Sequence, residues 1–92
     1  MIFAKVVGTV VANQKDEKLE GSKLLLCQET DAEGNDYEDD SYHVAVDAVK
    51  AGVGDFVLIS YGSSARMTSS TRDSPIDAVI MAIIDDVELT ED

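Results

Sequence analysis

The chain has 92 residues, of which 45% are hydrophobic but only 5% aromatic, and its 19 acidic and 7 basic residues give a formal net charge of −12. This length makes one domain, spanning residues 1–92, which buries only about 60–65% of the surface that its unfolded form exposes. The negative charge opposes nucleic-acid phosphates and anionic lipid. No apolar leader or membrane span opens the chain, so we expect a cytosolic protein that binds neither nucleic acid nor membrane.

The first half of the chain carries two predicted strands. Residues 3–12 are rich in Val and Thr and contain Gly8, where we expect the strand to bend. Residues 22–29 include four consecutive apolar residues, a pattern typical of a strand that is covered on both faces. In a small barrel such cover requires a neighbouring chain or a helix. The single cysteine, Cys27, lies in this run and is predicted to be a reduced core thiol.

An acidic segment follows, in which residues 29–40 carry seven carboxylates and no basic side chain. A calcium loop is the first site to test there. Aligning Asp31, Glu33 and Asn35 with the first ligands of an EF-hand puts Asp36 where that loop needs its glycine, and helical flanks are missing. We therefore predict a solvated hairpin tip and no metal site.

Two more strands surround a glycine-rich turn. Residues 42–49 alternate in character, which puts Tyr42 and Val44 on one face and His43 with Ala45 on the other, and we expect His43 on an open or edge face. Asp47, Gly52 and Gly54 then shape the turn that leads into a strand over residues 56–61, because glycine tolerates positive φ and a close backbone approach.

The last element has signals of both kinds. Ser74, Pro75 and Asp77 have the pattern of a helix N-terminus, yet residues 79–87 are mostly β-branched and apolar, which favours a buried strand. We expect a short helical segment near residues 75–79 and then a strand that closes the sheet. The chain is thus predicted to be mainly β, with five strands.

The sequence contains no catalytic or cofactor pattern. The turn Gly52-Val53-Gly54 lacks the third glycine of a dinucleotide site, because position 57 is valine, and it leads into a strand instead of a helix. The residues 62–66, Gly-Ser-Ser-Ala-Arg, do not form a Gly-x-Ser-x-Gly elbow. A single histidine offers no metal constellation. No enzyme activity and no cofactor are therefore expected.

Arg66 is the remaining candidate for a specific role. A guanidinium cannot lose its charge, so an Arg66 that small neighbours let approach a packed region must find acceptors, with Asp47, Asp77 and Asp85 as candidates. A solvated arginine at a strand end is the alternative.

Ordered motifs along nearly the whole chain carry a resemblance. They are KVVGTVVA at 5–12, LEG at 19–21, KLLL at 23–26, VDAV at 46–49, AGVGD at 51–55, GSSAR at 62–66, SPID at 74–77 and IID at 83–85. Each piece is weak alone, but the collinear set is similar to the EutN/CcmL family of bacterial microcompartment vertex proteins.

The resemblance implies a small OB-like, five-stranded β-barrel that assembles into a pentamer. Such a pentamer is a structural protein that caps the five-fold vertices of a shell in the cytoplasm, either a carboxysome or a catabolic metabolosome, beside hexameric and trimeric facet proteins. It further implies a place at the subunit interface or axial opening for a short segment and one aspartate: Gly62, Ser63, Ser64, Ala65, Arg66 and Asp77.

Two other classes compete with a shell vertex. A ring-forming co-chaperonin-like barrel needs a mobile loop with an apolar anchor, whereas residues 29–40 offer only Tyr37 among acids. An OB-fold module for single-stranded nucleic acid needs a basic groove with stacking aromatic side chains, which this composition opposes.

Overall fold

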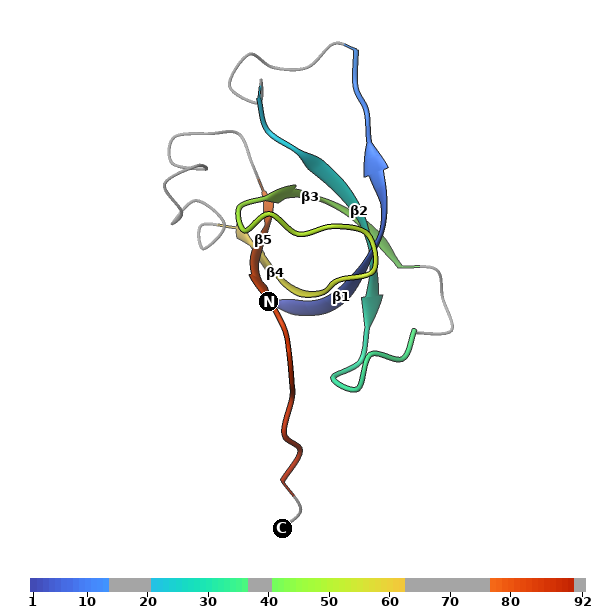
Figure 1. Ribbon diagram of the computed structural model, residues 1–92, viewed down its shortest axis with the longest axis vertical. Coiled ribbons are helices and arrows are strands. Elements are labelled where there is room, and N and C mark those ends of the chain that lie inside the picture. The colour runs from blue at the N-terminus through green and yellow to red at the C-terminus, as the bar shows by residue number, and fades with distance from the viewer. Residues whose placement is uncertain (14–20, 37–40, 63–76, 91–92) are drawn as a thin grey trace.

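Five β-strands close into a barrel in the order β1-β2-β3-β5-β4 (Figure 1). The computed structural model describes residues 1–13, 21–36, 41–62 and 77–90. The strands are β1 (Ile2–Val10), β2 (Leu24–Thr30), β3 (Tyr42–Asp47), β4 (Phe56–Tyr61) and β5 (Ala78–Ile83). All neighbours are antiparallel except β3 and β5, which run parallel. The predicted mainly β fold with a five-stranded barrel is confirmed.

The first strand pairs with β2 along one edge and with β4 along the other, and it has an irregularity in its middle. Its pairing with β2 shifts register between Val6 and Gly8, and only its first part, from Ile2 to Lys5, pairs with β4. A β-bulge of this kind increases twist and lets a small sheet close on itself. The bend predicted at Gly8 is therefore confirmed.

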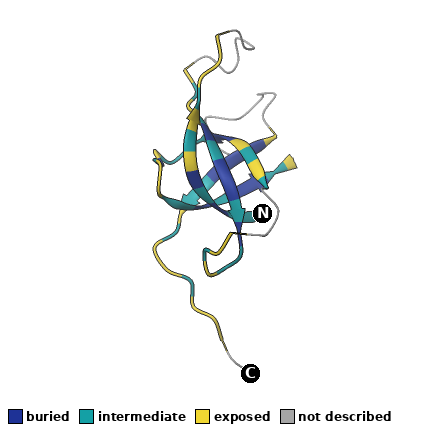
Figure 2. Ribbon diagram, turned by 90° about the vertical axis from the view of Figure 1, so that its right-hand side faces the viewer, coloured by how far each residue is buried: buried dark blue, intermediate teal, exposed yellow. Residues whose placement is uncertain are grey.

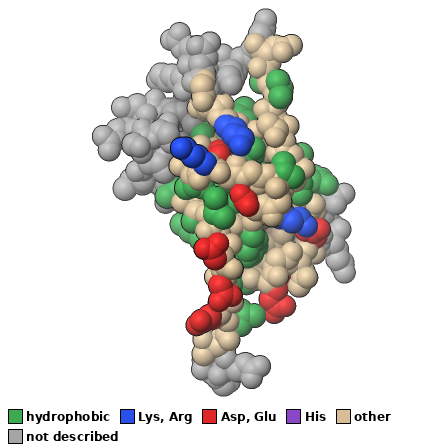
Figure 3. All heavy atoms as spheres, in the orientation of Figure 1, with side chains coloured by type: hydrophobic (Ala, Val, Ile, Leu, Met, Phe, Trp, Pro, Cys, Tyr) green, Lys and Arg blue, Asp and Glu red, His purple; other side chains and the backbone are tan. Residues whose placement is uncertain are grey.

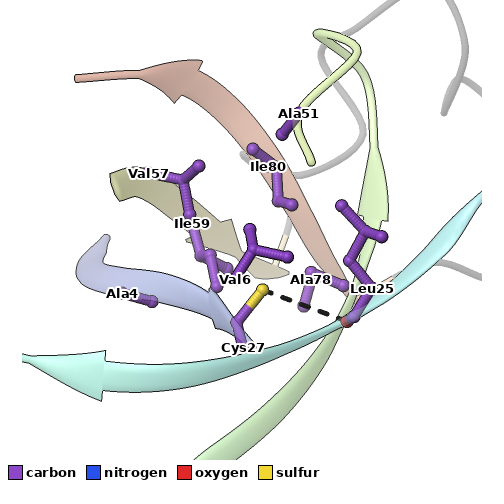
Figure 4. Packing of buried hydrophobic residues seen from close by; sticks show 10 residues of the cluster. Ala4, Val6, Leu25, Cys27, Ala51, Val57, Ile59, Ala78 and Ile80 are labelled. Atoms are coloured by element: carbon purple, nitrogen blue, oxygen red, sulfur yellow. Dashed lines mark hydrogen bonds between the residues drawn. The ribbon is translucent and has the colours of Figure 1, made fainter. Parts of the chain in front are cut away.

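Short aliphatic side chains fill the barrel. Alternate residues of β2, Leu25 and Cys27, point inward and are fully buried, while Leu24 and Leu26 are only half-buried on the outside (Figure 2). Figure 4 shows the inward residues converging from all sides of the barrel, among them Val6, Ile59 and Ile80. Thus the inner face of β2 is fully buried at Leu25 and Cys27. Its outer face, which we expected to be covered as well, is only partly covered by the residues of one chain.

The structure has a strand where part of the predicted helix was expected. Asp77 lies in a bend and β5 begins at Ala78, so the expectation of a helical segment near 75–79 is wrong from residue 77 onward. Positions 75 and 76 lie outside the described residues. The strand prevails because Val79 and Ile80 pair with both β3 and β4, which satisfies the backbone and buries both side chains completely.

Candidate subunit interface

The turn between β3 and β4 is held by its two aspartates. Asp47 Oδ1 accepts hydrogen bonds from the backbone N–H groups of Val49 at 3.0 Å and Ala51 at 3.1 Å. Asp55 Oδ2 accepts from the N–H of Gly52 at 2.8 Å. These bonds satisfy backbone donors that no strand can reach, so the acids fix the path of the turn.

Backbone contacts then tie this turn to the barrel. The N–H of Gly54 donates to the carbonyl of Val6 at 2.9 Å, and the N–H of Val6 donates to the carbonyl of Asp55 at 2.9 Å. Ala51 is buried in the core. Asp47 therefore serves its own subunit, and Arg66, for which it was one candidate acceptor, lies outside the described residues.

The second group of predicted site residues meets where β4 and β5 adjoin. The N–H of Gly62 donates to the carbonyl of Asp77 at 3.1 Å, and both residues are exposed. Ser63, Ser64, Ala65 and Arg66 lie outside the described residues. The structure thus brings Gly62 and Asp77 together and leaves the role of the intervening segment as a prediction.

An apolar surface crosses the outside of β1, β2 and β3. We call it the outer apolar face and define it by Val7, Leu26, Tyr42 and Val44. Tyr42 and Val44 are 52% and 50% exposed, Val44 pairs with Leu26, and Leu26 lies over Gly8. The sequence predicts Tyr42 and Val44 on the same face of this strand, but it gives that face no role. Alternate apolar residues on the exposed side of a strand are the signal that points to such a contact surface.

A chain of three polar side chains links β2, β3 and β4. His43 Nε2 lies 3.0 Å from Glu29 Oε1, and His43 Nδ1 is hydrogen-bonded to the Tyr61 hydroxyl. A carboxylate only accepts, so an Nε2–H group donates to Glu29, and in that neutral tautomer Nδ1 accepts from the Tyr61 hydroxyl. His43 is on the same side of β3 as buried Ala45, so its placement on an open or edge face was wrong.

The Tyr61 hydroxyl in this chain of side chains stays protonated and acts as a hydrogen-bonding group. Burial raises the pKa of the Tyr61 hydroxyl, and the nearby acids Glu29 and Asp77 raise it further. A phenol held in its protonated form is a poor nucleophile but a good hydrogen-bond donor. The three residues therefore fasten strands that are not all neighbours in the barrel.

Cys27 and the carboxylates offer no further site within the described parts of the chain. Burial raises the pKa of the Cys27 thiol to about 11, with the charge of Asp47 adding to the shift, so the reactive thiolate is disfavoured. No group of three His, Cys, Asp or Glu side chains among the described residues could hold a metal ion. Over the same ranges, no helix is long and apolar enough to cross a membrane.

Known proteins share this fold and much of this sequence. The family model described as ethanolamine utilisation protein EutN/carboxysome matches residues 1–85. The chain belongs to this family. The EutN/CcmL membership predicted from the ordered motifs is thereby confirmed.

Two relatives within the EutN/CcmL family show how close the match is. The carboxysome shell vertex protein CcmL of Nostoc sp. PCC 7120 is 48% identical over 92 residues, covering 99% of this chain and 89% of that protein. Its solved structure matches with a TM-score of 0.87 at 50% identity, over 95% of this chain and 92% of that one. GrpN from Rhodospirillum rubrum, a pentameric microcompartment shell protein, matches with a TM-score of 0.86 at 43% identity, over 98% and 100% of the two chains.

Proposed function

We propose that five copies of this chain form a ring that closes a five-fold vertex of a bacterial microcompartment shell in the cytoplasm. The observation that carries this proposal is the full-length similarity to GrpN, a pentameric shell protein with the same barrel at 43% identity. A ring of identical copies needs one patch on each copy that meets a different patch on the next. The chain would act as a structural protein and catalyse no reaction.

The surface of the barrel supports a packed contact between copies. The outer apolar face leaves two large side chains of β3 about half exposed, and Leu24 and Leu26 of β2 are only partly covered. A small domain whose own core is limited gains stability when a neighbour buries such a surface, at about 25 cal/mol per Å² of apolar area. We therefore place the outer apolar face in the subunit contact.

Repulsion between acidic side chains of different copies limits which parts of the chain can lie near the ring axis. Five copies carry about −60 formal charges, which oppose assembly if they crowd together. Lys5 lies 3.4 Å from Asp36 and holds the described part of the acidic hairpin against its own β1. We therefore expect the acidic hairpins to point outward, away from the axis.

The family resemblance supplies the remaining parts of the proposal. Gly62, Ser63, Ser64, Ala65 and Arg66, together with Asp77, would lie at the subunit interface or the axial opening, while Asp47, Gly52 and Gly54 shape the turn within each subunit. The edges of the ring would meet hexameric and trimeric shell proteins that form the flat facets.

Native mass spectrometry tests the proposed function. Five copies of the 9.9 kDa chain should give a single assembly of about 50 kDa. A monomer, or a ring of any other number at micromolar concentration, would overturn the proposal, because only a five-fold ring fits a five-fold vertex.

A further inference from the structure

The last described residues leave the barrel as an extended segment, which we call the C-terminal arm and define as residues 84–90 (Figure 1). Its root is fixed, since the N–H of Ile84 donates to the carbonyl of Phe56 at 2.7 Å. Beyond that root, none of the hydrogen bonds or ion pairs between described residues involves positions 85–90, and Asp85, Asp86, Glu88 and Leu89 are exposed. Its own barrel therefore does not hold the arm in place.

A basic pocket lies on the barrel itself. It is an open depression of about 390 Å³ that is lined by Gly21, Ser22, Lys23, Val46, Asp47, Ala48 and Lys50. Lys23 Nζ donates to the carbonyl of Ala51 at 3.0 Å, which anchors that cation at the pocket wall. Lys50 is exposed and has a φ of 62°, so its backbone is fixed by the turn.

The charge of this pocket is unusual for so acidic a chain. The described residues contain three basic side chains, and Lys5 is paired with Asp36 in its own subunit. The other two, Lys23 and Lys50, both line the pocket. Asp47 is the pocket's acid, and its Oδ1 already accepts two backbone N–H groups. The pocket therefore suits a carboxylate ligand.

The C-terminal arm and the basic pocket lie apart within one copy of the chain. Figure 3 shows all visible basic side chains over the body of the barrel and acidic side chains along the segment that projects at the bottom. The four residues from the root at Ile84 to Glu88 reach at most about 14 Å when extended. The arm can therefore place Glu88 on a surface of an adjacent copy that lies within this distance of its root.

We infer that the C-terminal arm of each subunit docks in the basic pocket of the next copy around the ring. In an extended chain, Asp86 and Glu88 project to one side and Val87 and Leu89 to the other. The inference pairs the Asp86 and Glu88 carboxylates with Lys23 and Lys50 of the neighbour. Such a contact joins unlike patches on identical chains, as a closed ring requires. It rests on the proposed function, because it needs a ring.

Disulfide trapping tests the contact directly. The double variant Lys50→Cys with Glu88→Cys should give, on mild oxidation, a ladder of cross-linked chains up to five, since the two positions meet only between copies. Cys27 is buried and should not take part. The matched control, Lys5→Cys with Glu88→Cys, places a partly exposed thiol on β1, outside the pocket, and should not form the ladder.

Charge reversal supplies a second readout on the assembled ring. Lys50→Glu or Glu88→Lys alone should raise the ring's dissociation constant by about three- to tenfold, and the double reversal should restore it. Lys5→Glu makes the same charge reversal on β1, outside the pocket, and should leave the effect of Glu88→Lys unchanged. If the wild-type chain forms a ring of five but the Lys50/Glu88 thiols do not cross-link chains, the arm contact is refuted and the proposed function stands. If the wild-type chain forms no such ring, the proposed function itself fails.

Discussion

At the scale of single residues, Gly54 is the glycine that has a positive φ in the turn between β3 and β4. Its φ is 97°, and its N–H bonds to Val6 at the bend of β1. No atom lies within 4 Å of the position that a Cβ would occupy there, so a side chain would meet strain and not a collision. Replacement at this position isolates the cost of the backbone conformation.

We expect Gly54→Val to lower the free energy of unfolding by about 1–3 kcal/mol, because a β-branched residue strongly disfavours this conformation. Chemical denaturation followed by circular dichroism measures the change. Gly52→Ala is the matched control, since its surroundings are equally open and its φ is not positive. Equal stability of the two variants would show that the turn does not depend on the φ of Gly54.

Cys27 predicts an alkaline limit to stability. Its pKa rises from 9.0 to about 11 on folding, because burial disfavours the thiolate. The folded chain therefore keeps a proton that the unfolded chain loses between these values, and the thiol's contribution, complete below pH 9, is lost as pH rises toward 11. The unfolding free energy of the wild type should fall more steeply over this range than that of Cys27→Ala. Parallel curves for the two proteins would contradict a shifted thiol.

At the scale of elements, the outer apolar face gives β3 two different sides. Its inward residue Ala45 belongs to the core, whereas Tyr42 and Val44 face outward and are about half exposed. In the proposed ring a neighbour covers this outward side. The exposed half of β3 should then matter for assembly and hardly at all for folding of the subunit.

We expect Val44→Asp to dissociate the ring while the subunit stays folded, because a carboxylate at a buried apolar contact costs several kcal/mol. Sedimentation velocity would report the assembly state and circular dichroism the fold. Val53→Asp makes the same change at a more exposed valine in the turn, 67% accessible, and should leave the ring intact. A stable ring in Val44→Asp would remove β3 from the subunit contact.

The elements also show what could be predicted from sequence. Composition and alternation predicted five strands, although β5 ends at Ile83 and not at residue 87, and the bend at Gly8 followed from one residue. The helix near 75–79 was wrong because local capping signals compete there with pairing to β3 and β4, which are distant in sequence. The partners of His43 were missed for the same reason, since Glu29 and Tyr61 lie 14 and 18 positions away. A pattern of residues that are close in sequence cannot predict contacts that form only when the barrel closes.

At the scale of the whole molecule, apolar contact between copies is opposed by their charge. Each copy brings a formal charge of −12 into the ring, and the described basic side chains outside the hairpin contact gather in one pocket. Added salt screens repulsion between copies with a Debye length of about 4–5 Å at 0.5 M, while apolar packing is not weakened. A ring held mainly by apolar contacts should therefore tighten as salt is added.

The most direct measurement is the mass of the native assembly at low salt and again at about 0.5 M salt. Native mass spectrometry from ammonium acetate, with light scattering in sodium chloride as a check, gives the number of copies under both conditions. We expect five copies at low salt and the same ring, at lower protein concentration, at high salt. A ring of another number, or one that falls apart at high salt, would contradict a five-fold vertex assembled through the outer apolar face.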